Sequence, residues 1–183
     1  MFDYKQHYTK TITDASKIQL LSEQVKEIVE HSSALNEAWY ESKGFVAVPV
    51  ESACHFDRKQ AVTLSKAMIE TGYSHCNAVA TEPLNEDDPC FIAVRTSAEG
   101  LLEFSDLTSH FNYVLIPDDA TFAVLCTTDD FFVICGEKKF VNCAVGGDIG
   151  KAREEFDHFA SGSESWKNMM IPIADKYKKT DRG

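Results

Sequence analysis

Residues 110–136 read HFNYVLIPDDATFAVLCTTDDFFVICG, and this stretch decides the fold of the chain. It contains three short apolar runs, Phe111–Ile116, Phe122–Cys126 and Phe131–Cys135. The runs are rich in β-branched and aromatic residues, which favour strands. They are nearly continuous rather than alternating, so we expect other elements to cover both of their faces.

The two segments between these runs are turn formers. Pro117-Asp118-Asp119 separates the first run from the second, and Thr127-Thr128-Asp129-Asp130 separates the second from the third. Proline presets its φ angle, and aspartate hydrogen-bonds its own backbone in a turn. The stretch therefore predicts a three-stranded antiparallel meander.

Working outward, the chain alternates further strands and helices. Apolar residues at steps of three and four predict a long N-terminal helix over about 14–42. A strand–helix–strand order between Phe45–Val50 and His75–Ala80 predicts a parallel pair with a right-handed crossover. Residues after Gly136 predict a C-terminal helical group. The expected fold class is α+β, with a mixed, mainly antiparallel sheet of about six strands around the meander.

Length and composition bound the other properties. The 183 residues, 44% hydrophobic and 26% charged, fit one globular domain over 1–183, with 1–12 and 178–183 expected to be flexible. No apolar run approaches a membrane span, and the first residues do not resemble a signal peptide. We therefore expect a cytoplasmic protein with no membrane partner. The six cysteines include no CxxC pair, so we expect them to be reduced.

The net charge of −11 is concentrated in one part of the chain. Residues 82–130 hold eleven Asp and Glu, while Arg95 is their sole basic residue, which leaves a local charge of −10. A field of this sign repels nucleic acid, which needs Lys and Arg against its phosphates. It attracts a cationic partner.

Candidate catalytic and metal-binding residues are few. Cys54-His55 and His75-Cys76 have the residue types of a zinc site, but a helix of about fourteen residues between them would hold the pairs roughly 20 Å apart. Neighbours on a strand also point to opposite faces. Cys54 near a helix N-terminus, with His110 as a distant base, leaves a cysteine enzyme as an alternative. We expect no metal and no cofactor.

The acidic loops are the remaining candidate surface. In a meander, successive turns lie at opposite ends, so Asp118-Asp119 and Asp129-Asp130 should be about a strand length apart. His110 should share the end of the second pair. The candidate partner-binding residues are Asp129, Asp130, Phe131 as an apolar anchor, Glu86, Asp87, Asp88 and His110.

These features suggest a class of binding protein. In kind, the chain resembles the cytosolic immunity proteins of bacterial toxin systems, which are small, acidic, single-domain proteins without a cofactor motif. The resemblance implies that it neutralises a cationic toxin of the nuclease type by presenting carboxylates where nucleic-acid phosphates would sit. The alternatives are a phage or host adaptor or decoy that binds a host protein, and an unassigned enzyme using Cys54 or His110.

Overall fold

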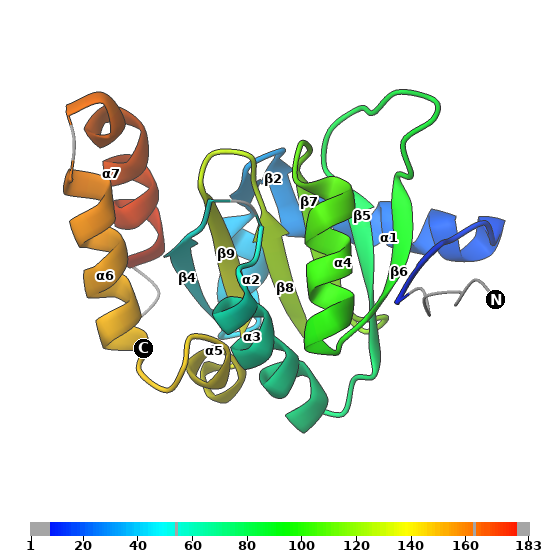
Figure 1. The fold of residues 1–183 in the computed structure, drawn as a ribbon, viewed down its shortest axis with the longest axis horizontal. Helices are drawn as coiled ribbons and strands as arrows, with labels where there is room; N and C mark the ends of the chain where they lie inside the picture. Colours follow the sequence, from blue (N-terminus) through cyan, green and yellow to red (C-terminus); the bar gives the residue numbers. More distant parts are fainter. Residues whose placement is uncertain (1–7, 54, 163, 179–183) are drawn as a thin grey trace, which may run out of the picture.

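The computed structural model describes residues 8–53, 55–162 and 164–178. In this part of the chain the fold is α+β, with a seven-stranded sheet of order β1-β6-β5-β7-β8-β9-β4 and a two-stranded sheet of β2 and β3 (Figure 1). The strands are β1 (Thr9–Thr11), β2 (Val29–His31), β3 (Ala34–Leu35), β4 (Val46–Glu51), β5 (His75–Ala80), β6 (Phe91–Arg95), β7 (Tyr113–Ile116), β8 (Phe122–Cys126) and β9 (Phe131–Gly136). The helices are α1 (Ala15–Ile28), α2 (Glu37–Ser42), α3 (Arg58–Glu70), α4 (Ala98–Thr108), α5 (Lys138–Ala144), α6 (Ile149–Ser161) and α7 (Glu164–Lys178).

The meander predicted from residues 110–136 is confirmed. β7 pairs antiparallel with β8, which pairs antiparallel with β9. Side chains alternate between two cores along β8, since Phe122 and Val124 belong to one hydrophobic cluster and Ala123 and Leu125 to the other. Every residue of the three strands is buried, because both faces are covered.

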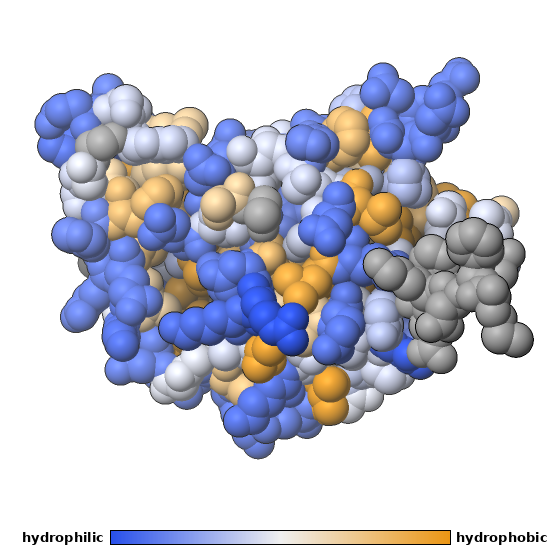
Figure 2. All heavy atoms as spheres, in the orientation of Figure 1, coloured by the Kyte–Doolittle hydropathy of each residue, from blue (hydrophilic) through white to orange (hydrophobic). Residues whose placement is uncertain are grey.

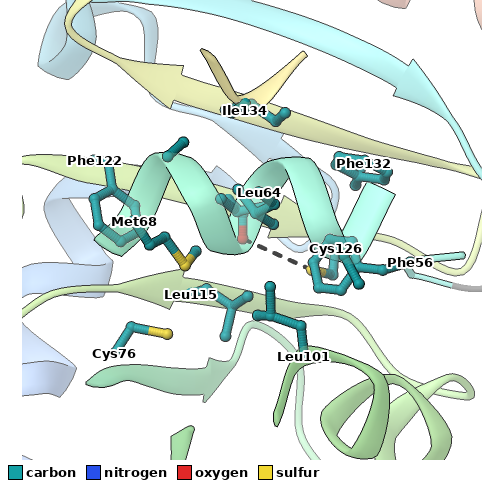
Figure 3. Packing of buried hydrophobic residues seen from close by; sticks show 14 of the residues in the cluster. Phe56, Leu64, Met68, Cys76, Leu101, Leu115, Phe122, Cys126, Phe132 and Ile134 are labelled. Carbon is teal, nitrogen blue, oxygen red and sulfur yellow. Dashed lines mark hydrogen bonds between the residues drawn. The ribbon is translucent and has the colours of Figure 1, made fainter. Parts of the chain in front are cut away.

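Different helices supply the two covers. α3, α4 and α5 pack on the face that is nearer in Figure 1, where Leu64, Met68 and Leu101 meet the sheet (Figure 3). On the far face, α1 and α2 contribute Leu21 and Tyr40. Both hydrophobic clusters are built on the same sheet, which makes that sheet the scaffold that positions the loops.

The predicted parallel pair is wrong. All pairs of the seven-stranded sheet are antiparallel, and β4 pairs with β9 over the register Val46↔Gly136 to Glu51↔Phe131. β4 and β5 do point in the same direction, but β9, β8 and β7 lie between them. Helix α3 crosses the face of these three strands, so a strand–helix–strand order here links distant strands.

The long N-terminal helix expected over 14–42 is also wrong. α1 ends at Ile28, and the chain then forms the β2–β3 hairpin before α2 begins. Asn36 makes this break possible, because its Oδ1 accepts a hydrogen bond from Ala38 N and caps α2, while its Nδ2 donates to Glu27 O. Ile28 and Leu35 are buried in the far-face core despite the break. The apolar spacing therefore marks core residues, although the helix is not continuous between them.

The two sheet edges are protected in different ways. Pro49 lies in the edge strand β4, where a missing backbone N–H is tolerated. The predicted C-terminal helical group is present, and Figure 1 shows α6 and α7 standing beside β4. Arg153 of α6 donates from an Nη atom to Ala47 O at 3.3 Å. The opposite edge strand, β1, has three residues and lies where an irregular segment was expected.

The remaining features of the fold are its cysteine thiols and the hydropathy of its helices. The five described cysteines, Cys76, Cys90, Cys126, Cys135 and Cys143, are free, and the sixth, Cys54, lies outside the described residues. Burial raises the pKa of the Cys76 thiol to about 12 and that of Cys126 well above its ordinary value, so both behave as small hydrophobic groups. No helix in the described ranges is both long and apolar enough to cross a membrane.

Candidate partner-binding site

Strand register brings three connecting segments to one end of the sheet. Ala80 at the end of β5 pairs with Tyr113 at the start of β7, and Tyr113 in turn pairs with Cys126 at the end of β8. The β5–β6 loop (81–90), the segment before β7 (109–112) and the β8–β9 turn (127–130) therefore share this end. Two strand spacings, roughly 10 Å, separate β5 from β8. Figure 1 shows the loop and the turn both projecting at the top of the sheet.

Asn112 joins the three segments. Its side-chain Oδ1 accepts a hydrogen bond from Thr128 N at 2.8 Å, and its backbone N–H donates to Glu82 Oε1 at 2.8 Å. Its carbonyl oxygen accepts from Thr81 N at 3.0 Å. Asn112 itself is 5% exposed, and its partly buried bonds connect the base of the loop with the turn.

The β5–β6 loop is held at further points. The Tyr113 hydroxyl donates to Pro89 O at 2.8 Å, close to the start of β6. Thr81 Oγ1 donates to Ser32 O at 2.7 Å, which ties the loop to the β2–β3 hairpin. A turn within the loop is closed by Asn85, whose Nδ2 donates to Asp88 Oδ2 at 3.2 Å. The loop is consequently tied to the rest of the fold near both of its ends, while the Asn85–Asp88 bond lies within it.

The β8–β9 turn is closed by Thr127. Its hydroxyl donates to Phe131 O at 2.6 Å and accepts from Asp129 N at 3.2 Å. Asp130 adopts a φ of 61°, a left-handed conformation that aspartate tolerates better than most residues. Its carbonyl oxygen accepts from Ser52 N at 2.9 Å, which fastens the turn to the end of β4.

We call Glu86, Asp87, Asp88, Asp129 and Asp130 the acidic rim. Glu86 and Asp87 are exposed, and the other three residues are partly exposed. The carboxylates of Glu86, Asp87, Asp129 and Asp130 make no ion pair with any residue that the structure describes. Five carboxylates thus stand on a braced end of the sheet with little neutralising charge.

The aspartates of the β7–β8 turn, at the opposite end of the sheet, are engaged within the fold. Asp118 lies 3.0 Å from Lys17 Nζ and accepts from Asn77 Nδ2 at 2.8 Å. These contacts, the bond from Asn77 first, lower the pKa of Asp118. Asp119 accepts a 2.6 Å hydrogen bond from the Tyr73 hydroxyl. The two Asp-Asp turns lie at opposite ends, as expected, and they differ in how far their charges are used internally.

Phe131 is not available as an apolar anchor. Its side chain is 1% exposed and packs in the far-face core, with its ring 6.1 Å from that of Phe156. The first residue of β9 points inward because register gives alternate residues to alternate cores. The expectation that this phenylalanine contacts a partner is therefore corrected.

The two histidines near this end have different environments. His110 is exposed, in the segment between α4 and β7. His55 is 1% exposed, stacks on Phe104 at 5.5 Å, and donates from Nε2 to Thr108 O at 2.9 Å. Burial lowers the pKa of His55 to about 4, opposed by the carbonyls of Thr108 and Thr127. His55 is therefore uncharged at neutral pH and acts as a packing residue.

The described residues do not bring together the zinc-site candidates that the sequence offered. His75 and Cys76 point to opposite faces of β5, the first exposed and the second buried, and they lie at the other end of the sheet from His55. Within the described residues, no group of three His, Cys, Asp or Glu could hold a metal ion. Cys54, the alternative nucleophile, lies outside the described residues.

Comparisons with known proteins add no family. No family model, curated protein or solved structure matches this chain. The candidate site is therefore defined by its geometry alone.

Sequence reasoning did not identify Asn112. A lone asparagine before a strand carries no pattern that separates a bridging residue from an ordinary loop residue. Its role depends on pairing between strands that are distant in sequence. The sequence also left open which end the Glu86–Asp88 segment joins, and strand order assigns it to the end that holds Asp129 and Asp130.

Proposed function

We propose that this protein binds a cationic protein through the acidic rim and thereby inhibits it, as an immunity protein does with a nuclease-type toxin. The observation that carries the proposal is the convergence of the Glu86–Asp88 segment and the Asp129-Asp130 turn at one end of the sheet. Asn112 bonds Glu82 at the base of the β5–β6 loop and Thr128 in the turn, so it ties the base of that loop to the turn. A braced surface loses little conformational entropy on binding, which favours affinity.

The electrostatics support a cationic partner. Roughly 10 Å, the spacing between β5 and β8, is close to the Debye length of about 10 Å at 0.1 M salt. The two acidic segments therefore start within about one Debye length of each other, which favours a joint action of their charges on one partner at low salt. A nuclease needs a cationic surface for its phosphate backbone contacts, and carboxylates that occupy that surface would exclude the substrate.

The rim variant and its control each remove two carboxylates, and they do so at opposite ends of the sheet. D129N/D130N keeps the turn, because asparagine tolerates the left-handed conformation at position 130. E99Q/E137Q removes two exposed carboxylates beside α4 and α5, at the end of the sheet away from the rim. Both variants change the net charge by +2, so a difference between their association rates reflects the position of the removed carboxylates.

The partner is first identified by pull-down from the native host, and its association kinetics with this protein are then measured at low and at high salt. We expect D129N/D130N to slow association severalfold at low salt and E99Q/E137Q to slow it much less, with the difference vanishing at high salt. A parallel assay of the partner's nuclease activity should show weaker inhibition by the rim variant alone. Equal and salt-independent association for all three proteins would refute the rim as the binding site.

A further inference from the structure

A cleft of about 320 Å³ opens between α3, β4 and α6, on the face that is nearer in Figure 1. Its accessible apolar wall is formed by Val50, Val145 and Ala152, and the nearly buried rings of Phe132 and Phe156 close its base. Figure 2 shows a hydrophobic recess between the column of α6 and the centre of this face. The volume falls at the lower end of the range of ligand pockets.

The mouth of the cleft has an acidic excess. Its charged residues are Glu51, Asp57, Asp148 and Glu155, opposed by Lys59 and Lys151. The two aspartates are used as helix caps, since Asp57 accepts from Gln60 N at 2.7 Å and Asp148 accepts from Lys151 N at 3.0 Å.

Glu51 and Glu155 remain for recognition. The side chain of Glu51 is exposed and has no ion-pair partner among the described residues. Glu155 makes a 3.8 Å contact with Lys151, an exposed pair that contributes little free energy. Two carboxylates of the cleft lining can therefore pair with a cationic group at the mouth.

The cleft is continuous with the acidic rim. Glu51 pairs with Phe131, the residue after Asp130, and Ser52 N donates to Asp130 O at 2.9 Å. One side of the cleft mouth is therefore bonded directly to the turn that carries Asp129 and Asp130. A partner seated on that turn would extend over the cleft.

We propose that the cleft receives an arginine side chain of the cationic partner, an inference that rests on the function proposed above. The aliphatic stem lies along Val50, Val145 and Ala152, and the guanidinium lies at the mouth beside Glu51 and Glu155. Arginine fits better than lysine, because its planar, weakly hydrated head pairs with carboxylates while its stem covers apolar surface. The cleft then supplies the apolar contact that Phe131 cannot.

A small probe tests this without the partner. N-acetyl-arginine amide is titrated at millimolar concentrations into methyl-labelled protein, with N-acetyl-leucine amide and N-acetyl-glutamate amide as matched probes. We expect the arginine probe alone to shift the methyl signals of Val50, Ile134 and Ala152 in a saturable manner. No shift, or an equal response to the leucine or glutamate probe, would overturn the proposal, and a stronger response to glutamate would reassign the cleft to anions held by Lys59 and Lys151.

Variants separate the cleft from the rim. E51Q/E155Q keeps the size of two exposed side chains and should lower the affinity for the arginine probe about fivefold. A152W should block the cleft, and D129N/D130N should bind the probe as the wild type does. With the full partner, slower association of D129N/D130N together with unchanged dissociation of E51Q/E155Q would refute the cleft and leave the rim standing, whereas failure of both variants to matter would refute both.

Discussion

The Oδ1 atom of Asn112 accepts a 2.8 Å hydrogen bond from the backbone N–H of Thr128. This bond crosses from the segment before β7 to the β8–β9 turn, and the neighbouring bond from Asn112 N to Glu82 extends the connection to the β5–β6 loop. Through its side chain and its backbone, Asn112 thus ties the β8–β9 turn to the base of the β5–β6 loop.

Removing this amide should loosen the rim. In N112A, Thr128 N loses its partner, so we expect a loss of about 1–2 kcal/mol in the free energy of unfolding. Amide exchange, measured by hydrogen–deuterium exchange, should accelerate in 127–130, whereas the backbone of residue 112 keeps its bonds to Thr81 and Glu82. N77A is the matched control, because Asn77 is also buried and bonds Asp118 at the opposite end. Unchanged rim exchange in N112A would show that other contacts brace the loops.

His55 should make the folded state sensitive to acid. Its pKa is about 4 in the folded protein and about 6.5 when unfolded, so the unfolded state binds the extra proton between these values. The stabilisation is complete above about pH 6.5 and is lost as the pH falls towards 4, a change on the order of 3 kcal/mol. Urea unfolding of the wild type at about pH 5 and about pH 7.5 should capture about 2 kcal/mol of this change.

Two variants isolate this histidine. H55Q removes the titrating group and should flatten the difference between the two pH values, although it should also lower stability at both. H110Q removes an exposed histidine and should leave the wild-type difference intact. A steep pH dependence that persists in H55Q would assign the effect to the carboxylates.

Val124 tests the central position of β8. The side chain is fully buried in the near-face core, and V124D would bury a charge without a partner. We expect a loss of more than about 4 kcal/mol, or a fall in the thermal midpoint of about 10 °C or more for a chain of this size. V62D is the matched control, since Val62 is 51% exposed on α3. A cooperative V124D with the wild-type midpoint would contradict this placement.

The thiols should react in an order set by burial. Among the five described cysteines, Cys90 is exposed and should react first with a thiol reagent in the native protein. Cys143 should react more slowly, because partial burial and the hydrogen bond to Glu70 raise its pKa. Cys76, Cys126 and Cys135 should react after unfolding, and titration of the freshly purified, denatured chain should count six thiols. A count of two or four would indicate disulfides.

Local patterns in the sequence account for the individual strands of the meander and for two helix caps. The meander, Asp57 with Gln60 as the capping box of α3, and Asp148 as the cap of α6 all depend on residues close in sequence. These features follow from backbone preferences and short-range hydrogen bonds, which neighbouring residues determine. The same reasoning extended the N-terminal helix too far, because Asn36 forms a new cap whose backbone N–H and side-chain amide both bond the end of α1.

The sequence by itself determined that the chain has a buried antiparallel meander and an acidic central third, because strand propensity, turn chemistry and charge are local properties. Only the tertiary structure decided which strands pair outside the meander, and with them the edge position of β4, the burial of Phe131 and the location of Glu86–Asp88 at the same end as Asp129-Asp130. Pairing is a competition among all strands for partners, so it depends on the packing of α3 and α6 against the whole sheet. For the same reason, the cleft beside the rim has no counterpart in any single stretch of sequence.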